Sequence, residues 1–111
     1  MGCDMSEAND LAKYICTFLN DLDWVVWRNN SGQIKTSGYV VHLSPDGLGD
    51  VIGFDPRGHF VHIEIKIGAD KIRPKQAIMM ARIAVTKHGI VGVITSEKQF
   101  HEWFHNCLRI G

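Results

Sequence analysis

The stretch GDVIGFDPRGHFVHIEIK, from Gly49 to Lys66, decides the fold and places charged residues within an apolar pattern. At its centre, Pro56-Arg57-Gly58 has the composition of a three-residue hairpin loop with Gly in the left-handed position. We therefore predict two antiparallel strands in which Asp50 lies directly opposite Glu64. A register shifted by one residue would separate these two carboxylates.

Side chains alternate between the two faces of a strand, so the second strand of this hairpin has an apolar face and a polar face. The apolar face holds Val61, Ile63, Ile65 and Ile67, and the polar face holds His62, Glu64 and Lys66. Opposed carboxylates repel, and a divalent cation between them removes that repulsion. Mg²⁺ prefers oxygen ligands, typically one or two carboxylates completed by water and phosphate. The hairpin therefore predicts a cation site at Asp50 and Glu64, with a solvated Glu-Lys pair on an open sheet face as the alternative.

Outward from the hairpin, the chain reads as an α/β domain with a small mixed β-sheet flanked by helices. The predicted order is a helix, three strands, a helix, a strand and a C-terminal helix, in a single domain over residues 1–111. The first helix is capped at Ser6 and has an apolar stripe to Leu22, and a strand over 24–29 and an extended segment near Tyr39 to Leu43 follow it. Arg73-Pro74 begins the second helix and Gly89 ends it. A buried strand over 90–95 is followed by a capping pattern at Ser96 to Gln99 and by an apolar helix face that includes Leu108.

Composition restricts the class of protein. The 111 residues are 45% apolar with a formal net charge of zero, which suits one globular domain. No apolar run approaches the 18 or more residues of a membrane span, and the first ten residues lack a basic and an apolar region, so we expect neither a membrane span nor a secretion signal. Three cysteines without CxxC spacing fit free thiols in a reducing cytoplasm.

Basic residues cluster although the whole chain is neutral. Between Lys66 and His88 there are six basic residues and one acidic residue, Asp70. Such a region can attract a polyanion, and a solvated helix face is the alternative explanation. The six are Lys66, Lys71, Arg73, Lys75, Arg82 and Lys87.

A second metal hypothesis concerns the C-terminal helix. His101 and His105 are spaced i, i+4, and Cys107 follows closely. Zinc takes such ligands, although a fourth ligand and the usual spacing are missing. Surface histidines are the alternative.

The ordered set Gly49-Asp50, Glu64-Ile65-Lys66 and Gln76 resembles the PD-(D/E)XK nuclease superfamily, and more closely the virus-type replication-repair nuclease (VRR-NUC) domain. The resemblance extends from the first helix to about Ser96 and includes Arg28-Asn29, the Asn30-Ser31-Gly32 turn, GLGDVIGF, IEIK and the helix from Pro74 to His88. It implies a restriction-endonuclease-like core and Mg²⁺- or Mn²⁺-dependent hydrolysis of DNA.

The resemblance also implies roles for individual residues. Asp50 and Glu64 would bind the metal, and Lys66 would orient or help to deprotonate the attacking water. The other implied site residues are Ile65, whose carbonyl would be a third ligand, Gln76, which would support the site by hydrogen bonding, and Glu7, which would be an acid on the first helix.

The implied substrate is branched DNA such as a four-way junction, cut by a symmetric homodimer in the cytoplasm of a bacterium or a phage-infected host. Trp24, Trp27 or the C-terminal helix could supply the apolar surface of such a dimer. A DNA-binding subunit that does not cut is the alternative function. The expected phosphate contacts are Arg28, Lys71, Arg73 and Lys75.

Overall fold

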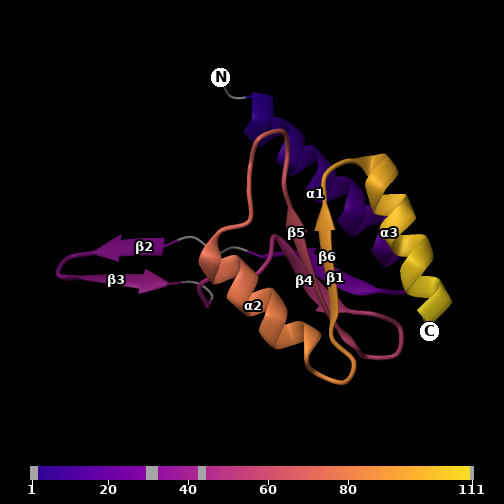
Figure 1. The fold of residues 1–111 in the computed structure, drawn as a ribbon. Coiled ribbons are helices and arrows are strands. Elements are labelled where there is room, and N and C mark those ends of the chain that lie inside the picture. The colour runs from indigo at the N-terminus through magenta and orange to yellow at the C-terminus, as the bar shows by residue number, and fades with distance from the viewer. Residues whose placement is uncertain (1–2, 30–32, 43–44, 111) are drawn as a thin grey trace.

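The computed structural model describes residues 3–29, 33–42 and 45–110 of the chain (Figure 1). The expected turn at residues 30–32 and the expected end of an extended segment at residue 43 lie outside these ranges. The elements are α1 (Cys3–Asp21), β1 (Val25–Arg28), β2 (Gln33–Thr36), β3 (Tyr39–His42), β4 (Val51–Phe54), β5 (Phe60–Ile65), α2 (Pro74–Ala84), β6 (Ile90–Ile94) and α3 (Glu97–Ile110).

Four strands form one mixed sheet in the order β1-β4-β5-β6. β4 pairs antiparallel with both β1 and β5, whereas β6 runs parallel to β5. A parallel pair needs a crossover connection, and α2 supplies it. α1 and α3 lie together on one side of the sheet and α2 lies on the other (Figure 1). The prediction of a small mixed sheet flanked by helices is confirmed.

The hairpin between β4 and β5 has the predicted loop. The Asp55 N–H donates to the His59 carbonyl, and the Gly58 N–H donates to the Asp55 carbonyl, both at 2.9 Å. Gly58 has φ +87°, the left-handed conformation that this loop requires. The register is confirmed over the paired strands, with the partners Phe54–Phe60, Gly53–Val61, Ile52–His62 and Val51–Ile63.

The two faces of β5 are equally buried and chemically opposite. Val61, Ile63 and Ile65 belong to the hydrophobic core that α1 and α3 cover. His62, Glu64 and Lys66 alternate with them and retain only 0%, 1% and 7% of their accessible surface. The predicted alternation is confirmed, but the polar face is buried, so the alternative of a solvated Glu-Lys pair is wrong.

Two helix boundaries differ from the prediction. α1 begins at Cys3 rather than after Ser6, since residues 3–6 include no Gly or Pro that would stop a helix. α2 ends at Ala84 rather than at Gly89. The Thr86 hydroxyl donates to the Ile83 carbonyl at 2.6 Å and accepts the Gly89 N–H at 3.0 Å, which replaces helical hydrogen bonding by a turn.

Two leucines expected on buried helix faces are exposed. Leu22, in the turn after α1, exposes 45% of its surface, and Leu108, near the end of α3, exposes 60%. The apolar stripes of α1 and α3 therefore end earlier than the periodicity predicts.

The predicted capping pattern before α3 is present, because the Ser96 hydroxyl accepts the Gln99 N–H at 3.1 Å.

The segment between β1 and β4 is more structured than the sequence predicted. β2 and β3 pair with each other antiparallel in a separate two-stranded sheet. This hairpin extends away from the four-stranded sheet (Figure 1). Across the described ranges, no helix is both long and apolar enough to span a bilayer.

Candidate metal and nucleic-acid site

Asp50 and Glu64 come together at the end of the β4–β5 hairpin. The Asp50 N–H donates to the Ile63 carbonyl at 2.8 Å, and one carboxylate oxygen of Asp50 accepts the Ile65 N–H at 2.7 Å. Glu64 lies close enough to Asp50 to raise the pKa of its carboxyl group. The hairpin therefore unites the two acids that the sequence predicted.

Asp50 is not part of the regular ladder, however. The paired residues of β4 begin at Val51, so the predicted pairing of Asp50 directly opposite Glu64 is wrong in this detail. In a continued ladder the Ile65 N–H would reach the Gly49 carbonyl. Instead, the Asn29 side-chain amide donates to the Gly49 carbonyl at 2.9 Å, and the Ile65 N–H donates to the Asp50 carboxylate.

Asn29 holds the Gly49–Asp50 segment from the neighbouring strand. Its backbone N–H donates to the Asp50 carbonyl at 2.9 Å, in addition to the side-chain bond to Gly49. The sequence resemblance included Asn29 but gave it no role. A polar residue directly after an edge strand was the only available signal.

The environment of Asp50 raises the pKa of its carboxyl group from 3.8 to about 6. Burial is the largest cause, and the neighbouring Glu64 raises the pKa further. The hydrogen bond from the Ile65 N–H and the positive charge of Lys66 lower it. A second carboxyl group beside Asp50 makes a negative charge on Asp50 more costly, and a bound cation would lower that cost.

Gln76 is at the predicted position in the first turn of α2. Its side-chain N–H donates to Glu64 Oε1 at 3.0 Å, and its Oε1 accepts the Arg73 N–H at 2.8 Å. The second bond caps the helix, so one side chain fixes both the start of α2 and one oxygen of Glu64. The Gln76 side chain is therefore half-buried rather than solvated.

Lys66 is nearly buried and extends from the same face of β5. Its Nζ atom lies 3.7 Å from Asp70 Oδ2, at the edge of ion-pair distance. The charge of Lys66 also acts on Asp50, as the pKa of that carboxyl shows. A cation thus lies beside the two carboxylates.

His62 lies next to Glu64 and was not predicted to have a role. It is fully buried, and its Nδ1 accepts the Gly49 N–H at 3.3 Å. Its Nε2 lies 3.4 Å from Glu64 Oε2. In the described part of the chain, these two buried atoms have no hydrogen-bond partner that meets ordinary geometry.

Glu7 is exposed in α1, and it lies well inside the helix because α1 begins at Cys3. Among the described contacts, no hydrogen bond or ion pair connects Glu7 to Asp50, Glu64 or Lys66. Its place in the site stays a prediction.

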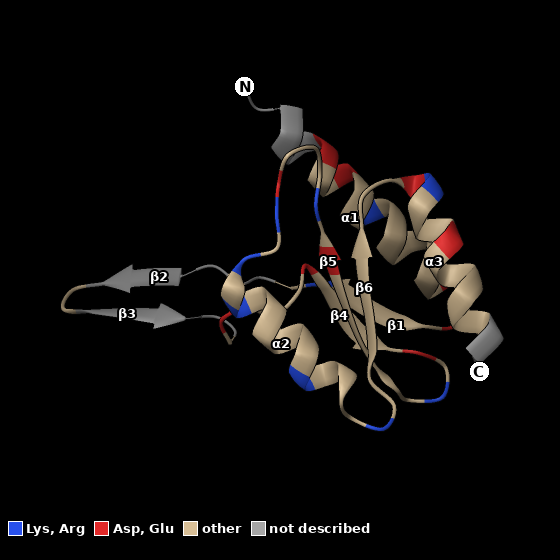
Figure 2. Cartoon of the chain, viewed as in Figure 1, with Lys and Arg blue, Asp and Glu red and all other residues tan. Residues whose placement is uncertain are grey.

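Basic residues cluster near the start of α2 (Figure 2). Lys71, Arg73 and Lys75 are exposed, as phosphate contacts would be. Lys75 forms a 3.0 Å ion pair with Asp46. Arg28 is also exposed and donates to the Asn9 side chain at 2.8 Å. Surface pairs of this kind contribute about 0–1 kcal/mol, so phosphate oxygens can compete for these cations.

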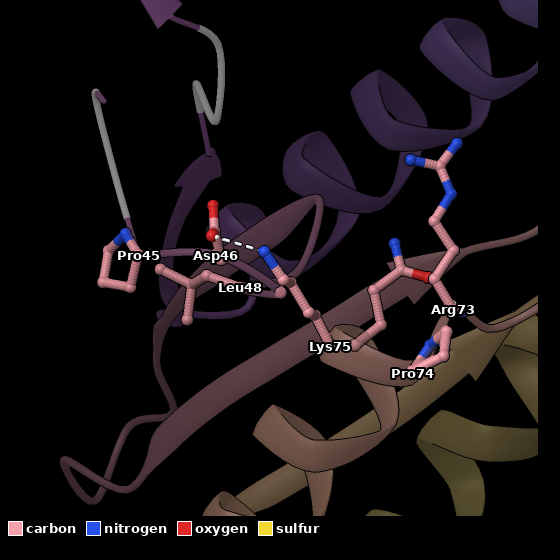
Figure 3. Close-up of a pocket in the computed structure, with 8 residues that line it drawn as sticks. Pro45, Asp46, Leu48, Arg73, Pro74 and Lys75 are labelled. Atoms are coloured by element: carbon pink, nitrogen blue, oxygen red, sulfur yellow. Dashed lines mark hydrogen bonds and ion pairs between the residues drawn. The ribbon is translucent and has the colours of Figure 1, made fainter. Parts of the chain in front are cut away.

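An open pocket of about 500 Å³ lies between the start of α2 and the loop before β4 (Figure 3). Gln76 belongs both to this pocket and to the contacts of Glu64, which makes the pocket an approach to the carboxylate pair. It is lined by Pro45, Asp46, Gly47, Leu48, Arg73, Pro74, Lys75 and Gln76.

The hypothetical zinc site on α3 is not supported. His101 Nε2 lies 2.7 Å from the Tyr14 hydroxyl. Burial raises the pKa of the Cys107 thiol to about 11, which opposes the thiolate that zinc needs. Among the described side chains, no group of three or more His, Cys, Asp or Glu residues is arranged to hold a metal.

That result also means that Asp50 and Glu64 are two protein carboxylates without a third close acid or histidine ligand among the described side chains. Mg²⁺ usually keeps several waters and binds through one or two carboxylates, so this pair suits Mg²⁺. The Ile65 carbonyl lies on the same side of β5 as its N–H, and hence toward Asp50. Comparisons with protein-family models, curated proteins and solved structures found no match to this chain.

Proposed function

We propose that the protein is a Mg²⁺- or Mn²⁺-dependent DNA endonuclease with a PD-(D/E)XK core of the VRR-NUC type. The observation that carries the proposal is the half-buried carboxyl group of Asp50 beside the buried side chains of Glu64 and Lys66. Withdrawing charged groups from water is costly unless they are paired or bind an ion. Phosphodiester hydrolysis is a reaction for which such a set is suited.

Asp50 and Glu64 would hold the cation, with the Ile65 carbonyl as a third oxygen. The residues present fit this role, since Glu64 Oε2 is a buried oxygen without a regular hydrogen-bond partner among the described residues. When bound, the cation would polarise the phosphate and lower the pKa of a bound water. Lys66 would orient the attacking water and offset the charge that develops on the phosphate.

The basic side chains around α2 support a nucleic-acid substrate. Arg73 and Lys75 line the open pocket beside Gln76, and contacts from such residues position a DNA backbone without reading its sequence. We therefore favour structured DNA, such as a four-way junction, over DNA of a specific sequence as the substrate.

A homodimer would supply two cutting sites for two strands. Trp24 is buried in the core and cannot contribute to a dimer interface. Val25, Trp27 and Phe54 are more than two-fifths exposed and lie on the sheet face that carries His62 and Glu64. These three residues are the apolar surface on which a symmetric partner would pack.

A DNA-binding subunit that does not cut is the second candidate. It is favoured by the burial of Glu64, which exposes only 1% of its surface. Binding through the basic residues of α2 would not require the carboxylates. Salt-sensitive junction binding without cleavage in Mg²⁺ or Mn²⁺ would identify this function.

The test is cleavage of a labelled four-way junction, compared with flap, duplex and single-stranded DNA, with EDTA controls. We expect metal-dependent cutting by the native chain, and its loss in Asp50→Asn and Lys66→Met. Glu102→Gln is the matched control, since it removes an exposed acid on α3, on the opposite side of the sheet. Cleavage that survives both site substitutions would contradict the proposal.

A further inference from the structure

His62 connects Gly49 to Glu64 inside the protein. The ring has no solvent exposure, and each of its nitrogens faces one of these residues. Nδ1 accepts the Gly49 N–H at 3.3 Å, and Nε2 lies 3.4 Å from Glu64 Oε2. A buried histidine between a backbone donor and a carboxylate has its proton position dictated by these neighbours.

The hydrogen bond from Gly49 assigns the tautomer of His62. A ring nitrogen that accepts an N–H uses its lone pair and carries no proton, so the ring proton is on Nε2. Nε2 therefore carries the proton 3.4 Å from Glu64 Oε2 and has no lone pair with which to bind a metal. This excludes His62 as a ligand and makes it a hydrogen-bond donor to a proposed ligand.

The two oxygens of Glu64 have different neighbours. Gln76 donates to Oε1 at 3.0 Å from α2, whereas the Nε2 atom of His62 lies 3.4 Å from Oε2, outside ordinary hydrogen-bond geometry. A polar group beside each oxygen limits the rotation of the carboxylate and leaves lone pairs on both oxygens.

Gly49 provides the space for this arrangement. A Cβ atom at position 49 would lie 2.6 Å from the Ile63 carbonyl oxygen and 3.0 Å from His62 Nε2. Any larger residue would displace either the ring or the strand. The absence of a side chain at Gly49 and the ring of His62 thus belong to one local structure.

We propose that His62 is a positioning residue for Glu64, which it orients through its Nε2–H for cation binding. The consequence for metal binding rests on the proposed function, whereas the tautomer and the contact with Glu64 do not. Hydrogen bonds to metal ligands typically change metal affinity or activity by about 10–100-fold. We expect an effect of this size from His62.

The first test is nitrogen-15 NMR of the native chain without metal. We expect a proton on Nε2 and none on Nδ1 at neutral pH, and a shift of the Nε2–H resonance in Glu64→Gln. A proton on Nδ1 would overturn the proposal. This measurement requires no folded variant of His62.

The second test compares Mn²⁺ affinity, measured by calorimetry, in His62→Gln and His62→Asn. The Gln amide reaches the position of Nε2 and retains a donor to Glu64, whereas the shorter Asn retains only an acceptor for Gly49. We expect His62→Gln to bind Mn²⁺ within about threefold of the native chain, and His62→Asn to bind about 10–100-fold more weakly. Equal affinities in these two variants would overturn the positioning role.

The two levels of the proposal can be separated. A native chain that binds no Mn²⁺ and cuts no junction would contradict the proposed function, while the NMR result would still report on the tautomer. A native chain that binds Mn²⁺ and cuts junctions, with His62→Asn unchanged, would contradict the role of His62 alone.

Discussion

The two faces of β5 share one backbone and one degree of burial but have opposite physical roles. On the face toward α1 and α3, Ile63 is completely buried among apolar side chains, and each such residue stabilises the fold by about 1.5–3 kcal/mol. On the face toward α2, Glu64 is equally buried among polar groups, and its charge costs free energy. The apolar face thus stabilises the hairpin, whereas the polar face withdraws charged groups from water at a cost in stability.

The largest expected effect separates function from folding on the polar face. In Glu64→Gln, junction cleavage should fall by roughly 10³-fold, because a proposed ligand of the catalytic cation loses its charge. The circular-dichroism spectrum should stay unchanged. A cleavage assay in Mg²⁺ measures the first quantity, and retention of more than a tenth of the activity would contradict the assigned role.

Truncation on the apolar face should do the reverse. Ile63→Ala removes buried methyl groups and leaves a cavity, so we expect a loss of about 2–5 kcal/mol in the free energy of unfolding. Urea denaturation measures this loss. Ile63 and Glu64 are adjacent in sequence but lie on opposite faces of β5. A small loss of unfolding free energy in Ile63→Ala would show that the apolar core is not the main source of stability.

A third prediction concerns the cost of the charges. The pKa of Asp50 is raised from 3.8 to about 6 in the folded state, so the folded chain holds this proton more tightly than the unfolded chain does. Asp50 therefore favours folding below pH 3.8, and this contribution is lost as the pH rises through about 6. In EDTA, Asp50→Asn should be more stable than the native chain by on the order of 1–2 kcal/mol at neutral pH, after allowance for partial exposure.

Thermal melts from pH 3 to pH 8 would check this sign. The stability gain of Asp50→Asn should shrink as the pH falls and vanish below about pH 4. A gain that is independent of pH, or a destabilised variant at neutral pH, would contradict the electrostatic account. Asp21→Asn, in an exposed turn of α1, is a suitable control.

The smallest effect concerns the basic residues outside β5. Lys71→Ala should weaken binding to all DNA forms by a similar factor and reduce the slope of log affinity against log salt by about 0.9. Fluorescence anisotropy at several salt concentrations measures this slope. Lys98→Ala, on exposed α3, should leave the slope unchanged.

The sequence predicted the hairpin because its signal is local. Pro56-Arg57-Gly58 permits few loop geometries, and the loop sets the register that unites Asp50 with Glu64. The position of Gln76 in the first turn of a helix was also predictable, because Pro74 two residues earlier marks the start of that helix. Local turn chemistry thus placed the charged residues, whereas the roles of Gln76 and Lys66 came from the family resemblance.

What the sequence could not give depends on contacts between distant segments. Asn29 binds Gly49 across 20 residues, and the role of His62 follows from two neighbours that only the folded chain supplies. The break in the ladder at Asp50 depends on these same contacts. The end of α2 was missed for a local reason, since the Thr86 hydroxyl competes with the helix for the Ile83 carbonyl.

The most direct test of the central claim is a crystal structure grown with MnCl₂ at a concentration that supports junction cleavage, with anomalous diffraction used to locate the metal. The account predicts an anomalous peak in contact with carboxylate oxygens of both Asp50 and Glu64. The account would be contradicted if the protein cleaves junctions in the crystal mother liquor while the crystal shows no peak at this pair, or shows a peak bound by other residues.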